Sequence, residues 1–264
     1  MTVRPLAGRC ALITGSTSGI GLAVAEALGA QGADLMLNGL VDDRSAETLC
    51  RSLGERHGVR VAHHGADVSH PGEVEALIDA AQRHAGGLDI LVNNAGISHV
   101  APLEAFPAER WDALLSVHLS AAFHTMRLAL PGLQQRGWGR IVNIASVFGL
   151  IATQHQAAYV AAKHGLVGLT KVVALETARS PVTCNAVCPG LVSTPRVLRD
   201  VQSRADELGI PLEEAKRMTM STRQPAGEYI AAADVAAVVA FLCSPQAAEV
   251  RGVAWAIDGG WTAR

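Results

Sequence analysis

Apolar and polar positions along this chain fall into blocks that predict strands and helices in turn. Residues 10–14 form a short apolar run that leads into glycine-rich sequence, and residues 20–31 then carry apolar side chains at helical spacing. Further apolar runs of strand length lie at 33–38, 59–64, 88–92, 140–145, 182–187 and 254–257. Helical patterns separate these runs, at 43–57, 71–85, 109–135, 231–243 and around Tyr159.

This alternation favours an α/β fold, in which residues 1–264 form a single Rossmann-type domain. We expect a doubly wound parallel sheet of about seven strands with helices on both faces and ligands at the carboxyl ends of the strands. Residues 190–226 break the alternation, with Pro195, Pro211, Pro225 and two short helical patterns. A segment this long without a strand is typical of a lid or a substrate-pocket wall.

Composition narrows the classes of partner. Hydrophobic residues make up 49% of the 264 positions and aromatic residues only 4%, which suits a compact sheet packed with alanine-rich helices. The net charge of -2 provides no basic surface for nucleic acid or a membrane. Residues 1–8 contain no apolar signal core, and no run approaches the ~18 apolar residues of a membrane span. We expect a cytoplasmic protein with a small-molecule substrate.

The cysteines predict neither a disulfide framework nor a metal site. Their number, five, is odd, and they are scattered in apolar surroundings. Cys184 and Cys188 lack a second pair of ligands. We therefore expect reduced thiols and no metal.

A glycine-rich turn at residues 14–21 joins the first predicted strand to the first predicted helix. Glycines there permit a tight turn and allow backbone amides to approach a pyrophosphate at the helix N-terminus. The turn, with the spacing TGxxxGxG, predicts a nucleotide site made by Gly15, Thr17, Ser18, Gly19, Ile20 and Gly21.

Tyr159 and Lys163 lie four residues apart in alanine-rich sequence, so they share one face of the predicted helix. A tyrosine with a pKa of about 10 needs a neighbour that stabilises its phenolate before it can act as a base near neutral pH. Lys163 is such a neighbour. Taken alone, the pair is also common on ordinary helix surfaces.

Several motifs together resemble the short-chain dehydrogenase/reductase family over nearly the whole chain. They occur in that family's order and approximate spacing: TGxxxGxG at 14–21, NNAG at 93–96, Ser146 after the fifth strand, YxxxK at 159–163 and PG at 189–190. The resemblance implies a nicotinamide-binding Rossmann domain that also carries the catalytic residues. It further implies a homotetramer built on the two long helices and the C-terminal segment.

The resemblance also implies how the cofactor binds. Asp67 would meet the adenine, Asn94 would lie beside the adenosine ribose, and residues 189–194 would surround the nicotinamide end. The implied cofactor residues beyond the glycine turn are Asp67, Val68, Asn94, Ala95, Gly96, Tyr159, Lys163, Pro189, Gly190, Val192 and Thr194.

NAD is favoured over NADP. A 2′-phosphate is usually bound by a nearby arginine or lysine, and neither residues 16–18 nor residues 38–40 contain one. Arg44 remains a candidate for that contact, and the usual acidic ribose partner is absent after the second strand.

The predicted chemistry is hydride transfer between a secondary alcohol and nicotinamide. As a phenolate, Tyr159 would remove the alcohol proton, and Ser146 would hold the oxygen. Lys163 would lower the pKa of Tyr159 and, by the resemblance, bind the nicotinamide ribose. His118 stands where the family often has an asparagine that organises a relay water. We expect a variant relay, with a buried packing histidine as the alternative.

Several stretches most resemble bacterial D-3-hydroxybutyrate dehydrogenases, including 158–165 and 258–264. That subgroup binds the substrate carboxylate with a glutamine, a histidine and a lysine, where this chain has Ser98, Phe148 and Gln156. A buried carboxylate needs charged or multiple donors. The candidates to replace them are Arg196, Arg199 and His99, and Leu191 completes the predicted substrate residues.

The leading interpretation is an NAD-dependent, 3-hydroxybutyrate-dehydrogenase-like enzyme. Phe148 suits a less polar alcohol, so the substrate stays open at this point. The alternatives are a dehydrogenase or reductase for a neutral secondary alcohol, a sugar or polyol, or a 3-oxoacyl group, and a non-catalytic nucleotide-binding protein.

Overall fold

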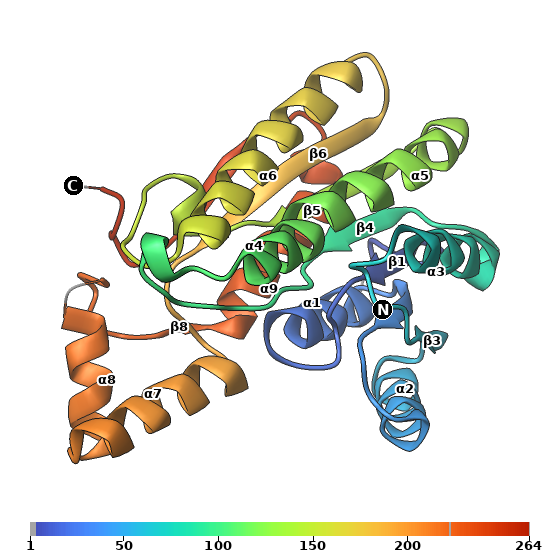
Figure 1. The fold of residues 1–264 in the computed structure, drawn as a ribbon. Coiled ribbons are helices and arrows are strands. Elements are labelled where there is room, and N and C mark those ends of the chain that lie inside the picture. Colours follow the sequence, from blue (N-terminus) through green and yellow to red (C-terminus); the bar gives the residue numbers. More distant parts are fainter. Residues whose placement is uncertain (1–3, 222, 264) are drawn as a thin grey trace.

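Seven parallel strands form the central sheet of the computed structural model, which describes residues 4–221 and 223–263. Their order is β3-β2-β1-β4-β5-β6-β9 (Figure 1). They are β1 (Cys10–Ile13), β2 (Asp34–Asn38), β3 (Val61–His64), β4 (Ile90–Asn93), β5 (Gly139–Ile144), β6 (Val182–Pro189) and β9 (Ala254–Ile257). The predicted α/β fold is thereby confirmed. Residues 1–3, 222 and 264, which our prediction included in the domain and in the 190–226 segment, lie outside the described residues.

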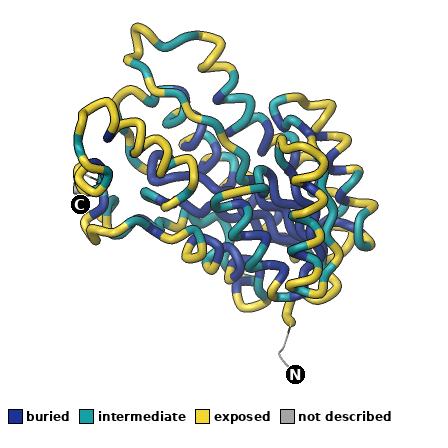
Figure 2. The backbone as a smooth tube through the Cα atoms, turned by 90° about the horizontal axis from the view of Figure 1, so that it is seen from below, coloured by how far each residue is buried: buried dark blue, intermediate teal, exposed yellow. Residues whose placement is uncertain are grey.

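Helices cover both faces of the sheet, as predicted (Figure 1). Along β1, Leu12 packs in the cluster beneath α3, α5 and α6, while Ala11 and Ile13 pack beneath α1, α2 and α9. This alternation is the two-residue period of a strand that is buried on both sides. Buried residues are accordingly concentrated in the middle of the molecule (Figure 2). The helices are α1 (Gly19–Ala30), α2 (Asp43–His57), α3 (Pro71–Arg83), α4 (Ala108–Leu115), α5 (Ala121–Gln135), α6 (Ala157–Glu176) and α9 (Ala232–Cys243).

The order of the strands reverses at β1. This strand pairs with β2 on one side and with β4 on the other, and both pairings are parallel. The crossover connections therefore leave β1 and β4 in opposite directions, which opens a crevice at the carboxyl ends of the two strands. The glycine turn after β1 and the NNAG loop after β4 meet there.

The helix predicted at 109–135 contains a π-helical turn. Residues Ser116–Ser120 form this turn between α4 and α5. Such turns insert one extra residue into a helix and are frequent at functional sites. Here the turn carries His118.

The 190–226 segment forms a helical hairpin beside the main body, visible at the lower left of Figure 1. The two predicted helical patterns are α7 (Pro195–Leu208) and α8 (Leu212–Ser221). Val201, Ala205 and Ala215 form a small apolar cluster between them. One expectation was wrong: residues Val192–Ser193 form a short strand, β7, which pairs with β8 (Ile230–Ala231).

Among the described residues, two helical stretches, Ala108–Gln135 and Ala157–Glu176, have the length and mean hydropathy of a membrane span. Helices in the core of a soluble protein share these two properties. Both stretches contribute buried side chains, such as Met126 and Leu166, to the cluster on one face of the sheet. Their apolar character is therefore accounted for in part by packing against the sheet.

Candidate active site

A cavity of about 910 Å³ lies at the carboxyl ends of the strands and extends beneath α7 and α8. Of the predicted site residues, only Gly21 is absent from its walls. The predicted residues that line it are Gly15, Thr17, Ser18, Gly19, Ile20, Asp67, Val68, Asn94, Ala95, Gly96, Ser98, His118, Ser146, Phe148, Gln156, Tyr159, Lys163, Pro189, Gly190, Leu191, Val192, Thr194 and Arg196.

The glycine turn is packed against the loop after β4. A Cβ atom on Gly15, whose φ is +62°, would lie 2.8 Å from Cα of Ala95. A Cβ atom on Gly21 would lie 2.3 Å from the Gly15 carbonyl oxygen and 2.4 Å from Nδ2 of Asn94. Gly21 thus allows the close approach of α1 to the turn instead of lining the cavity. The N-terminus of α1 faces the cavity, where it favours an anion.

Amide side chains hold this half of the cavity in place. The Asn94 side chain donates to the carbonyl oxygens of Thr14 and Gly15, each at 2.9 Å. Asn38, at the end of β2, accepts from the Gly15 amide at 3.3 Å and donates to the carbonyls of His64 and Ala66. Sequence reasoning did not assign Asn38 this anchoring role. The sequence feature that could have pointed to Asn38 is an amide side chain at the end of an apolar strand.

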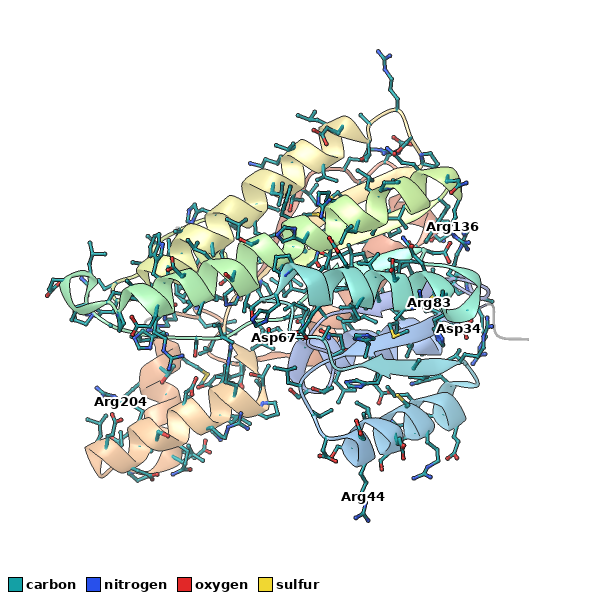
Figure 3. All side chains as sticks on the ribbon, turned by 45° about the vertical axis from the view of Figure 1, so that its right-hand side comes forward. Asp34, Arg44, Asp67, Arg83, Arg136 and Arg204 are labelled. Atoms are coloured by element: carbon teal, nitrogen blue, oxygen red, sulfur yellow. The ribbon has the colours of Figure 1, made fainter. Side chains whose placement is uncertain are left out.

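Asp67 follows β3 at the cavity wall, and Figure 3 shows it beside the strand ends. Its carboxylate accepts a hydrogen bond from the Ser69 amide at 2.9 Å. This hydrogen bond is the main reason why the pKa of Asp67 is lowered. Asp67 is therefore an ionised acceptor at neutral pH.

Ser146, Tyr159 and Lys163 meet at the end of β5. Oγ of Ser146 accepts a hydrogen bond from the Phe148 amide at 3.1 Å. Tyr159 lies in the first turn of α6, and Lys163 lies one turn further on. Nζ of Lys163 donates to the Ile144 carbonyl at 2.7 Å and lies 5.6 Å from the centroid of the Tyr159 ring.

Burial shifts the pKa values of Tyr159 and Lys163 toward their neutral forms. It raises the pKa of Tyr159, while a hydrogen bond with Ser146 and the charge of Arg196 act to lower it. Burial also lowers the pKa of Lys163 to about 7, and Arg196 adds to that effect. The hydrogen bond with Ser146 and the charge of Arg196 thus both favour the phenolate of Tyr159.

His118 lies in the π-helical turn with its ring edge against the Tyr159 ring, the two centroids 5.0 Å apart. Nε2 lies 2.7 Å from the Ile97 carbonyl oxygen and 3.2 Å from the Ile97 amide nitrogen, and the shorter contact favours a proton on Nε2. Burial lowers the pKa of His118 to about 3, so the ring is neutral. Nδ1 is buried without a hydrogen-bond partner among the described residues, and a second cavity of about 10 Å³ adjoins His118 and Lys163.

An aromatic wall borders the substrate side of the cavity. Phe148 packs edge-on against Tyr159, with centroids 6.4 Å apart, and against Trp261, with centroids 5.3 Å apart. Asp258 holds the segment that carries Trp261, because its carboxylate accepts from the amides of Gly260 and Thr262. Sequence reasoning missed Trp261. Its signal was an aromatic residue in an otherwise polar terminal segment.

Arg196 lines the same cavity from the first turn of α7. Its Nη1 lies 3.5 Å from the Gly96 carbonyl oxygen, and a Cβ atom on Gly96 would lie 2.6 Å from Cε1 of His118. The predicted candidates His99 and Arg199 also line the cavity. Among residues 4–221 and 223–263, no group of His, Cys, Asp or Glu side chains is arranged to hold a metal ion.

Comparisons with known proteins agree with this geometry. A family model described as enoyl-(acyl carrier protein) reductase matches residues 15–262. D-beta-hydroxybutyrate dehydrogenase from Cupriavidus necator is 53% identical over 259 residues, which are 98% of this chain and 100% of the relative. The enzyme of the same name from Rhizobium meliloti is 44% identical, over 97% of this chain and 99% of its own. Among solved structures, L-sorbose reductase from Gluconobacter frateurii complexed with NADPH and L-sorbose superposes with a TM-score of 0.94 at 30% identity, over 98% of each chain.

Proposed function

This chain belongs to the short-chain dehydrogenase/reductase family, and from this premise we propose that it oxidises a secondary hydroxy acid with NAD, with D-3-hydroxybutyrate as the leading substrate. The observation that carries the proposal is the convergence of Ser146, Tyr159 and Lys163 on the wall of a cavity that begins at the glycine turn. The substrate comes from the names of the two dehydrogenase relatives.

The glycine turn fits a dinucleotide. The space beside Gly15 admits no side chain, and the N-terminus of α1 favours the charge of a pyrophosphate. Residues 15–20 would hold the phosphates, Asp67 and Val68 the adenine end, and residues 189–194 the nicotinamide end. Bound nicotinamide supplies the hydride acceptor.

NAD fits the adenosine end better than NADP. Both amide hydrogens of Asn38 are used within the protein, and the exposed Leu40 offers no charge to a 2′-phosphate. Arg44 points from α2 into solvent in Figure 3. We expect kcat/KM for NAD to exceed that for NADP by at least ~10-fold, since a 2′-phosphate would find no cation. Equal or better turnover with NADP would contradict this preference.

Tyr159 is the proposed acid and base. Because Oγ of Ser146 accepts from the Phe148 amide, its own hydrogen can be donated to the oxygen of the substrate or of Tyr159. Lys163 uses one hydrogen on the Ile144 carbonyl, which leaves others for the nicotinamide ribose.

His118 is the proposed relay residue. A cavity of about 10 Å³ is close to the smallest volume that holds one water molecule, and its walls include the polar residues Thr14, Asn93 and Lys163. Such a water could donate to the unpartnered Nδ1 of His118. The neutral ring then acts as an acceptor where the family often has an asparagine.

The second candidate substrate is a neutral secondary alcohol, which the Phe148–Trp261 wall favours. The decisive measurement is NADH formation against a panel of hydroxy acids, neutral alcohols, polyols and 3-hydroxyacyl thioesters. Turnover of hydroxy acids above the other classes supports the proposal. Tight NAD binding with no turnover of any of them would favour a non-catalytic nucleotide-binding protein instead.

We also propose a homotetramer in the cytoplasm. Exposed apolar side chains on the long helices support assembly, among them Phe123 on α5 and Val172 and Leu175 on α6, the last of which is 78% exposed. Light scattering on the purified protein tests this, and a monomer at micromolar concentration would contradict it.

A further inference from the structure

The floor of the substrate region, formed by Ser98, Phe148 and Gln156, contains no charged donor for an anion. Ser98, Phe148 and Gln156 carry no charge, and the side chain of Phe148 is buried in the aromatic wall. A carboxylate that leaves water needs a charged or multiple donor in exchange. Any such donor must come from another part of the cavity.

The cations that line the cavity differ in whether they already have a hydrogen-bond or ion-pair partner within the protein. Lys163 is only 4% exposed and donates to the Ile144 carbonyl. Arg204 forms an ion pair with Glu207. Arg196, Arg199 and Arg223 also line the cavity, and none of the three has a carboxylate partner among the described residues.

Of these three arginines, Arg196 is the one with a hydrogen bond, within the described part of the chain, toward the surroundings of His118 and Tyr159. Its guanidinium meets the Gly96 carbonyl at 3.5 Å, and Gly96 packs on the His118 ring, which in turn packs on Tyr159. Its charge acts on the pKa values of all three titratable groups there, Tyr159, Lys163 and His118. A guanidinium has five donors, so a long contact to one carbonyl leaves a pair free for a bidentate carboxylate.

We propose that Arg196 binds the carboxylate of the substrate, so that helix α7 and not the pocket floor recognises the charged end of the hydroxy acid. This proposal rests on the proposed function. It places the specificity of the enzyme on the 190–226 segment, and it makes acid recognition depend on the position of α7.

The test compares Arg196→Gln with the wild type on D-3-hydroxybutyrate and on its neutral methyl ester. For the acid, kcat/KM should fall by about 10- to 100-fold, mainly through KM, because a charge-assisted pair is lost. For the ester, kcat/KM should change by less than about threefold. Arg196→Lys should recover part of the acid activity through KM. The matched control is Arg217→Gln, since Arg217 is exposed on α8 and does not line the cavity.

Equal losses for acid and ester would overturn the proposal and leave the dehydrogenase function standing. Calorimetric binding of butyrate to the NAD complex gives a reading that does not depend on turnover. The proposal is supported if Arg196→Gln weakens butyrate binding and Arg217→Gln does not. This reading holds even if the wild type oxidises neither substrate and the proposed function fails. Butyrate binding unaffected by Arg196→Gln overturns it.

Discussion

The glycine turn on one side of the cavity is fixed by hydrogen bonds to Asn38 and from Asn94, whereas α7 on the other side is held to α8 by a small apolar cluster. The first region consists mainly of residues of the TGxxxGxG and NNAG motifs, and its close contacts leave little room for other side chains. The second presents Arg196 and other exposed side chains on a helix outside the main sheet. We infer from this difference that the α7 side can vary in sequence without disturbing the glycine turn.

The largest effect is expected at the junction of the two regions. Tyr159→Phe should lower kcat by about 10³-fold, because the proposed acid and base of the reaction is removed. NAD affinity, measured by fluorescence titration, should change little in the same variant. Near wild-type kcat would show that another group carries the proton.

Gly21→Ala probes the rigid side. Its Cβ atom would meet backbone at 2.3 Å, so we expect about 1–3 kcal/mol of lost stability together with weaker NAD binding. The control is Gly168→Ala on α6, where nothing lies within 4 Å of an added Cβ atom and alanine favours the helix. Urea unfolding measures the free energy of unfolding of both variants. Equal values would show that the turn adapts to the added Cβ atom.

Lys163 makes stability depend on pH. Its pKa is about 7 when folded against 10.5 for the free side chain, so the unfolded chain binds more protons between these values. Burying the charged ammonium of Lys163 lowers the free energy of unfolding, and this cost is fully present below pH 7. As the pH rises, the cost is relieved by at most about 1.4 kcal/mol per pH unit. The free energy of unfolding should therefore rise less from pH 7 to 9 in Lys163→Met than in the wild type. If urea unfolding gave the same pH dependence of the free energy of unfolding for both proteins, a lowered pKa of the buried Lys163 would be contradicted.

His118→Asn should have the smallest effect. Asparagine can also accept a hydrogen bond from a water, so we expect kcat to stay within about threefold, while His118→Leu should lower it by about tenfold or more. Solvent isotope effects on both variants check the relay. Equal kcat values for the two variants would indicate a packing role for His118.

The sheet and the nucleotide side were predictable because local signals determine them. Buried strands appear as apolar runs, and glycines mark the turn whose close contacts exclude any side chain. The seven strands were found in this way, and the α4–α5 stretch was correctly expected to be helical. The π-helical turn within it could not be predicted, because the spacing of apolar residues around His118 looks like that of an ordinary α-helix.

The substrate side was less predictable because it depends on contacts between distant segments. β7 and β8 have only two residues each, too few for a pattern, and they pair across the whole hairpin. Trp261 lies at the cavity in a terminal segment whose turn is held by Asp258 and which packs on the distant Phe148. On the nucleotide side, the tight contact of Gly21 with the Gly15 carbonyl oxygen was likewise not visible in the sequence.

The position of Trp261 also gives the protein a built-in optical reporter. Of its four tryptophans, Trp261 is the one that lines the cavity within the described part of the chain. Its indole packs on Phe148 at the wall where the substrate is expected, so its emission should respond when a ligand enters. Occupancy of the substrate side could then be followed in real time with unlabelled protein, with Trp261→Phe providing the background signal.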